Sequence, residues 1–175
     1  MIEVRLSAFA RARLWGPMEL PAVAGGSVAD HVVKADAGAA AQDKNLAVEV
    51  AIPRGPVVSY GLLGGTYEQA ADELLKMSVL GGEQGEFDGS LAGPPETVIF
   101  GLPSEYVDGV ANGFLGGVDR LPATPGGSLV FDRAAYGRIG SSPLLFRELA
   151  VCVTRLVLGD PAPWDEVLRE ELKLK

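Results

Sequence analysis

The order of hydrophobic and polar residues predicts strands and helices in turn along the first half of the chain. Alternation with a period of two, which is typical of strands, covers residues 3–14 and 46–52. The breakers Pro53–Pro56 end the second of these strands, and residues 57–60 are expected to be its hairpin partner.

Two helices are expected in the same half. The first covers residues 27–42 and begins at Ser27, a residue type that caps helices. The second covers residues 66–79, because Thr66 followed by Gln69 has the form of a capping box. The first half therefore reads as strand, helix, strand, helix.

The second half repeats this order. The expected elements are a strand at 97–100, a helix at 103–114, a strand at 128–132, a helix from Ser142-Pro143 to the breakers Gly159-Asp160-Pro161, and an amphipathic helix at 164–174. The last helix would carry Trp164, Val167, Leu168 and Leu172 on one side and cover the rest of the domain.

One short phrase occurs twice, as Ser59–Thr66 and as Ala135–Ser142, each time just before an expected helix. The offset is constant, because 136 minus 60 and 142 minus 66 both give 76. The preceding helical segments match at an offset of 78, with apolar residues at Val28 and Val32 in one and at Tyr106, Val110 and Phe114 in the other. Either the chain is an internal duplication, or it uses a common strand-turn-helix pattern twice.

The sequence thus predicts an α+β fold, a two-layer sandwich of two pseudo-repeated βαβα halves. The halves are residues 1–80 and 96–175, joined by a linker rich in Gly, Pro and acidic residues at 81–95, within one compact domain. With 175 residues, 47% of them hydrophobic, the chain is long enough to bury a sizeable core.

Composition narrows the expected partners and chemistry. A net charge of −8 argues against extensive nonspecific binding to nucleic acid. The chain contains no apolar run near 18 residues, and its first residues lack the layout of a secretory signal, so we expect a soluble cytoplasmic protein with no membrane partner. One cysteine and one histidine make a disulfide framework or a thiolate metal cluster unavailable, and neither a metal nor a cofactor is expected.

Two segments of the second half resemble domain IV of translation elongation factor G. Residues 101–113, Gly-Leu-Pro-Ser-Glu-Tyr-Val-Asp-Gly-Val-Ala-Asn-Gly, are similar to the family's Pro-x-Glu-Tyr-(Ile/Val)-x-x-Val-x-x-Gly. Residues 136–146, Tyr-Gly-Arg-Ile-Gly-Ser-Ser-Pro-Leu-Leu-Phe, are similar to its Tyr-His-x-Val-Asp-Ser-Ser-x-x-x-Phe. The resemblance covers about residues 96–158. The first half is related to this family only through the internal repeat.

The resemblance implies the fold of that domain and a role in translation. In elongation factor G the turn before the second helix forms the tip that enters the decoding site. Its histidine corresponds to Gly137, so the expected side chain is missing here. The chain also lacks a phosphate loop of the Gly-x-x-x-x-Gly-Lys-(Ser/Thr) type, so neither GTP binding nor GTP hydrolysis by that route is expected.

The candidate binding residues gather at the two copies of the repeated phrase. Free amides at a helix start hold anions, arginine adds charge, and a tyrosine offers a face for stacking. The candidates are Tyr136, Arg138, Ser141 and Ser142 in the second copy, Tyr60 and Thr66 in the first, and Arg54 nearby. The alternative for each residue is ordinary capping, turn formation or packing.

Three hypotheses of function follow. The first is a stand-alone binding module similar to domain IV, without GTPase activity, with the ribosome or another translation component as partner. The second is a small-molecule-binding protein or enzyme with a site for a small anionic ligand between the two halves. The third is an assembly subunit that forms a homodimer through the apolar C-terminal helix. Whether the chain is an enzyme stays open at this stage.

Overall fold

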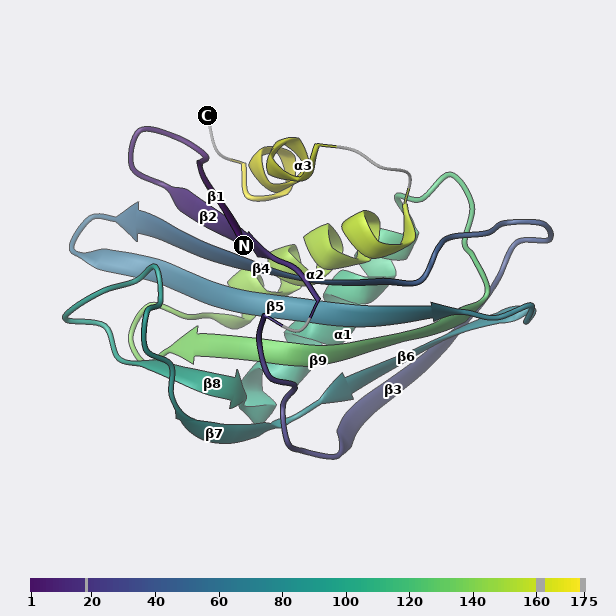
Figure 1. Ribbon diagram of the computed structural model, residues 1–175, viewed down its shortest axis with the longest axis horizontal. Helices are drawn as coiled ribbons and strands as arrows, with labels where there is room; N and C mark the ends of the chain where they lie inside the picture. The colour runs from purple at the N-terminus through teal and green to yellow at the C-terminus, as the bar shows by residue number, and fades with distance from the viewer. Residues whose placement is uncertain (18, 160–162, 174–175) are drawn as a thin grey trace.

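The computed structural model describes residues 1–17, 19–159 and 163–173 and contains one sheet of nine strands with three helices (Figure 1). The strands are β1 (Ile2–Arg5), β2 (Arg11–Trp15), β3 (Ser27–Lys34), β4 (Lys44–Arg54), β5 (Val57–Gln69), β6 (Leu74–Leu80), β7 (Gly82–Glu86), β8 (Val98–Leu102) and β9 (Gly127–Gly137). The helices are α1 (Ser104–Val118), α2 (Pro143–Leu158) and α3 (Trp164–Glu171). The predicted α+β class is confirmed.

The sheet interleaves early and late parts of the chain. Its strand order is β1-β2-β4-β5-β9-β6-β3, and β8 joins β7 to β9 at one end. All pairs are antiparallel except β6 with β9, which run parallel and are separated in the chain by α1. Because β9 lies between β5 and β6, the segments before and after residues 81–95 share one sheet.

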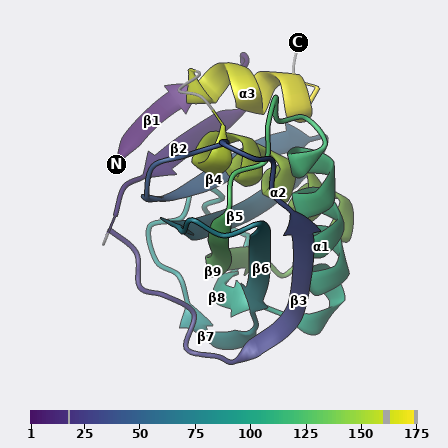
Figure 2. The ribbon, with the colours of Figure 1, turned by 90° about the vertical axis from the view of Figure 1, so that its right-hand side faces the viewer.

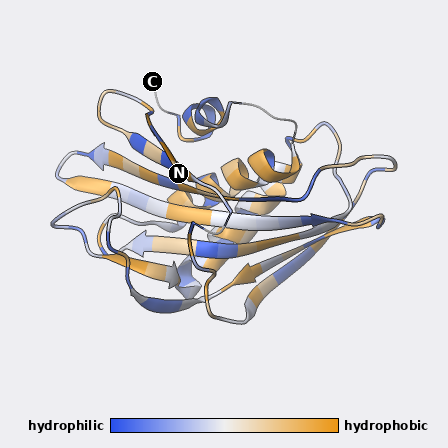
Figure 3. Cartoon of the chain, viewed as in Figure 1, coloured by the Kyte–Doolittle hydropathy of each residue, from blue (hydrophilic) through white to orange (hydrophobic). Residues whose placement is uncertain are grey.

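The helices α1 and α2 lie side by side on one face of the sheet (Figure 2). Figure 3 shows hydrophobic residues along α2 and also along the central strands, which lie in front of α2 in this view. Helix α3 packs on α2 and buries Val167, Leu168 and Leu172. The apolar face that was expected to mediate a dimer therefore belongs to the core of the chain itself.

Local signals fix the start of α2 as predicted. Ser142 is the N-cap and accepts a hydrogen bond from the Leu145 amide at 3.2 Å, and Pro143 is the first helical residue. The helix ends at Leu158 with Gly159 as its C-cap, while Asp160 and Pro161 of the predicted stop lie outside the described residues. The final helix begins at Trp164 as expected and ends at Glu171, and residue 174 of its predicted end also lies outside them.

The two helices predicted in the first half are wrong. Residues 27–34 form the strand β3, and residues 66–79 belong to the end of β5 and to β6. In β6 the buried residues are Leu75, Met77 and Val79, an alternation with the period of a strand. The described part of residues 1–80 forms six of the seven strands in the order β1-β2-β4-β5-β9-β6-β3 and contains no helix, so the predicted βαβα order of this half is also wrong.

Smaller predictions need correction as well. Residues 3–14 form not one strand but the hairpin β1–β2, in which the Ala10 amide bonds to the Ser7 hydroxyl at 3.2 Å. Helix α1 continues to Val118, four residues beyond its predicted end. The first repeated phrase lies wholly inside β5, whereas the second ends β9 and turns into α2, and the two are paired through Gly61 and Tyr136.

Candidate functional site

The turn between β9 and α2 carries most of the predicted site residues. Strand β9 ends at Gly137, and Arg138 and Ile139 follow with exposed side chains, Ile139 at 67%. The Arg138 amide donates to the carbonyl of Thr97 at 3.1 Å, which ties the turn to the start of β8. The turn is thus anchored through its backbone and presents its side chains to solvent.

Glu96 occupies the backbone amides of this turn. One of its carboxylate oxygens accepts from the Ile139 amide and the other from the Gly140 amide, each at 3.0 Å. An anion was expected near this helix start, and the chain supplies one from its own carboxylate. Sequence reasoning missed Glu96 because it lies far upstream, in the segment interpreted as linker and second-half start.

Glu96 also fills the space beside Gly137. A Cβ atom added there would lie 2.8 Å from the Glu96 carboxyl carbon. A side chain at residue 137 and the present position of Glu96 therefore exclude each other.

The two serines of the turn have structural partners. Ser141 donates its hydroxyl to the Tyr60 carbonyl at 2.6 Å and accepts from the Gly137 amide at 2.8 Å. The hydroxyl of Ser142 caps α2. Of the interpretations weighed for these serines, capping and turn formation describe the contacts they make.

An aromatic cluster joins β9, α1 and α2. The ring of Tyr106 in α1 lies 5.8 Å from that of Tyr136, edge to face, and is stacked on Phe146 of α2 at 4.8 Å. Tyr136 donates its hydroxyl to the carboxylate of Glu83. Burial, reinforced by this carboxylate, raises the pKa of Tyr136 to about 12, so the tyrosine stays a neutral hydrogen-bond donor.

Tyr60 is not available to a partner, contrary to the prediction. Its side chain is fully buried, and its hydroxyl donates to Glu49 at 3.0 Å. Glu49 is likewise fully buried and accepts from the Trp15 indole at 3.1 Å and from the Leu91 amide at 2.7 Å, with Arg13 at 3.6 Å. This carboxylate network was not foreseen, although a glutamate inside the apolar strand 46–52 was a visible signal.

Thr66 does not begin a helix and does not face the turn at Ser142 across a cleft. It lies in β5, donates to Asp132 at 2.7 Å and accepts from Asn45 at 2.9 Å and from Arg133 at 3.2 Å. The predicted pair of helix starts around one site is therefore wrong, because only the second of them exists. The small anionic ligand between the halves stays a prediction without this support.

Arg54 lies exposed at the hairpin between β4 and β5. It lines a groove of about 410 Å³ with the exposed side chains of Phe9 and Leu144. No residue that the structure describes forms an ion pair with Arg54, Arg138 or Arg147. Arg138 precedes α2 and Arg54 shares a groove with Leu144 and Glu148 of α2, so positive charges lie near its start in a chain of strongly negative net charge.

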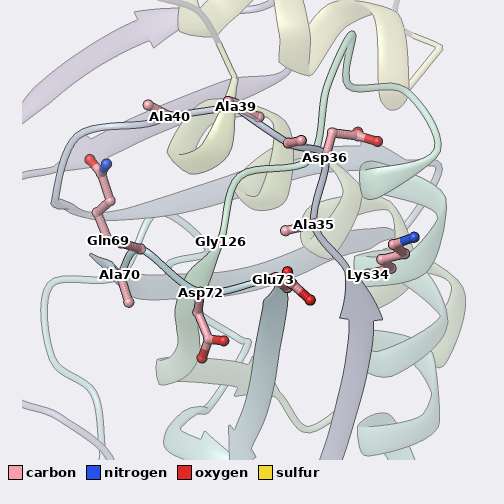
Figure 4. A pocket seen from close by; sticks show the side chains of 13 residues that line it. Lys34, Ala35, Asp36, Ala39, Ala40, Gln69, Ala70, Asp72, Glu73 and Gly126 are labelled. Carbon is pink, nitrogen blue, oxygen red and sulfur yellow. The ribbon is translucent and has the colours of Figure 1, made fainter.

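A pocket of about 660 Å³ lies at the opposite end of β9 (Figure 4). Residues 34–40 and 69–73 line it together with Gly126, and the lining includes six alanines and three acidic residues. Asp36 accepts from the Thr124 amide at 2.8 Å, and Asp72 pairs with Lys76 at 3.3 Å. None of the predicted site residues lies there.

Comparison with known protein families gives no match, and neither does comparison with curated proteins. Among the helices of the described residues, none has the length and apolar character needed to cross a membrane. In the same part of the chain, no three His, Cys, Asp or Glu side chains are grouped so that they could hold a metal ion. The turn with its exposed arginine and isoleucine is suited to contact a partner surface.

Proposed function

We propose that the chain is a stand-alone binding module similar to domain IV of elongation factor G, acting in the cytoplasm without GTP hydrolysis. Its partner in this proposal is the ribosome or another translation component. The observation that supports the proposal is the contact of Tyr106 with both Tyr136 and Phe146, since these three aromatic residues belong to the two resembling segments. Segments that match a family in order and also pack together are more informative than either segment alone.

The binding surface in this proposal is the turn between β9 and α2. Arg138 and Arg54 offer unpaired charges to phosphate groups, and Ile139 offers an exposed apolar contact. The rest of the surface is acidic and repels a polyanion, so few phosphates are contacted and binding weakens only moderately with salt. Affinity then depends strongly on each arginine of the turn.

Sedimentation with purified ribosomes at moderate salt tests this proposal. We expect the wild-type chain to sediment with ribosomes and Arg138→Glu to bind roughly tenfold more weakly, a loss of about 1.4 kcal/mol. Arg5→Glu is the matched control, because Arg5 is also exposed but lies in β1, at the far end of the strand order from the turn after β9. It makes the same charge change and should leave binding unaltered.

Two results would overturn the proposal. One is a wild-type chain that stays in the supernatant at every salt concentration. The other is equal weakening by both arginine variants, which would indicate a nonspecific charge effect and no role for the turn.

A further inference from the structure

Strand β3 is an edge strand of the sheet, and helix α1 packs against it. It is the last strand in the order, and within the described residues it pairs only with β6 (Figure 2). Val28 and Val32 are 53% and 58% exposed, which is unusual for β-branched residues on an edge. An eight-residue edge with exposed valines is a template for a further strand.

The polar residues of this edge have a pattern that complements itself. Asp30, Val32 and Lys34 are alternate residues and so share one face of the strand. The pairing with β6 is regular from Ala29 to Lys34, and the irregularity lies between Ser27 and Ala29. The regular part of the edge is therefore centred on a valine with an acid on one side and a base on the other.

We propose that β3 pairs antiparallel with β3 of a second copy of this chain, with the twofold axis at Val32. This register places Val32 opposite the partner subunit's Val32. It also places Asp30 opposite the partner subunit's Lys34, and the symmetry repeats that ion pair on the other side of the axis. Directly opposite pairs of this kind, apolar with apolar and acid with base, stabilise paired strands.

Other registers lack this complementarity. A shift that brings Asp30 opposite the partner subunit's Asp30 sets two carboxylates against each other. A shift by a single residue would exchange the faces of one strand relative to the other. The exposed valines of the two copies would then no longer lie on the same face of the joined sheet. The charge pattern thus selects both the partner, which is a copy of the chain, and the register.

The groups concerned are fixed and charged in the single chain. The hydroxyls of Ser78 and Ser27 donate to the Asp30 carboxylate at 2.6 and 2.8 Å, and because Ser78 lies opposite Asp30 in β6, these bonds fix the carboxylate on the exposed face of the sheet. These hydrogen bonds, that of Ser78 above all, lower the pKa of Asp30, so it is ionised at neutral pH. Lys34 has an exposed side chain and no ion pair among the described residues.

A charge exchange tests the register. Molar mass by light scattering, measured over a range of protein concentrations, should show a reversible dimer for the wild type. Asp30→Lys alone and Lys34→Asp alone each place like charges opposite one another at two symmetric positions, so each should weaken dimerisation about tenfold or more. The double variant restores opposite charges at both positions and should recover the dimer, although it lacks the two serine contacts of Asp30.

A pair of valine variants tests the position of the axis. Val32→Lys sets two lysines against each other at the twofold and should give a monomer. Val28→Lys is the matched control, since Val28 lies at the irregular end of β3 and faces no residue of the partner's strand in this register. Far-ultraviolet circular dichroism shows that each variant is folded.

Three outcomes would overturn the proposal: a wild-type chain that is monomeric at every concentration, a dimer that Val32→Lys leaves intact, or a double charge variant that stays as weak as the single ones. None of them bears on ribosome binding, because that proposal concerns the turn after β9 and this one the edge formed by β3.

Discussion

A single residue, Glu49, links three separate parts of the chain on the sheet face away from the helices. Its carboxylate lies in β4 and accepts hydrogen bonds from Trp15 in β2, Tyr60 in β5 and the backbone of Leu91. A buried carboxylate is costly to desolvate, and these donors together with Arg13 offset that cost. The segment around Leu91 is thereby held against the sheet.

We predict that Glu49 makes the stability of the protein depend on pH. Burial raises its pKa above the usual 4.5, so over a range above that value the native state binds more protons than the unfolded chain. The stabilisation is fully present below pH 4.5 and is lost as the pH rises through the native pKa. Glu49→Gln, which does not titrate, should lack this dependence.

Urea unfolding of both proteins at neutral pH and near pH 4.5 checks this prediction. The free energy of unfolding of the wild type should rise relative to that of Glu49→Gln as the pH falls. A difference that is the same at both pH values would contradict the assignment.

At the scale of elements, the contact between α1 and α2 depends on glycines four residues apart. Gly109, Gly113 and Gly117 face α2, where an added Cβ at Gly117 would lie 2.6 Å from Thr154. At Gly113 it would lie 2.6 Å from the Cβ of Ala150 and overlap the Arg147 carbonyl oxygen. The absence of side chains at these positions lets the two helix backbones approach closely.

We predict opposite effects for two Gly→Ala substitutions in α1. Alanine is the better helix former by about 1 kcal/mol, so Gly116→Ala should stabilise the protein, since its Cβ meets only Val151 at an ordinary 3.6 Å. Gly113→Ala has the same helix propensity gain but forces the helices apart, and it should destabilise by about 1–3 kcal/mol. Chemical denaturation of both variants measures the difference, and two changes of the same sign would contradict the packing described.

The sequence predicts those elements whose bounds depend on neighbouring residues. It misses those that depend on strand pairing between distant residues. The start of α2 was predictable because Ser142 and Pro143 act within one turn of the helix. The helix expected at 27–42 rested on Val28 and Val32, but residues four apart share a face in a strand as well as in a helix. Residues 27–34 form a strand because they pair with β6.

The candidate site shows the same limit. The position of Arg138 in an exposed turn was predictable because glycines flank it in the sequence, whereas its role in binding stays a prediction. Glu96 was not, because its contact with the amides of Ile139 and Gly140 joins residues far apart in the chain. No spacing in the sequence encodes such a contact.

At the scale of the whole molecule, the position of β9 makes the two parts of the chain depend on each other. β9 supplies hydrogen-bonded neighbours to both β5 and β6, and α2 covers β4 and β5 from the early part. Without β9 and the helices, the strands before residue 81 would have two open edges in the middle of the sheet and an uncovered apolar face. A boundary in the sequence at 81–95 is therefore not a boundary between independent cores.

We predict that residues 1–95 and 96–175 do not fold when each is produced alone, but form the native structure when produced together. Each fragment lacks the neighbours that satisfy its central strands, while all of these contacts return on association because the cut lies in the loop between β7 and β8. Circular dichroism and thermal unfolding of the fragments, separately and mixed, measure this against the intact chain. The late fragment is the more informative case, since it carries α1, α2 and α3. Cooperative unfolding of that fragment by itself would show that β9, α1 and α2 form a core without β5 and β6, and would restore the division into two halves.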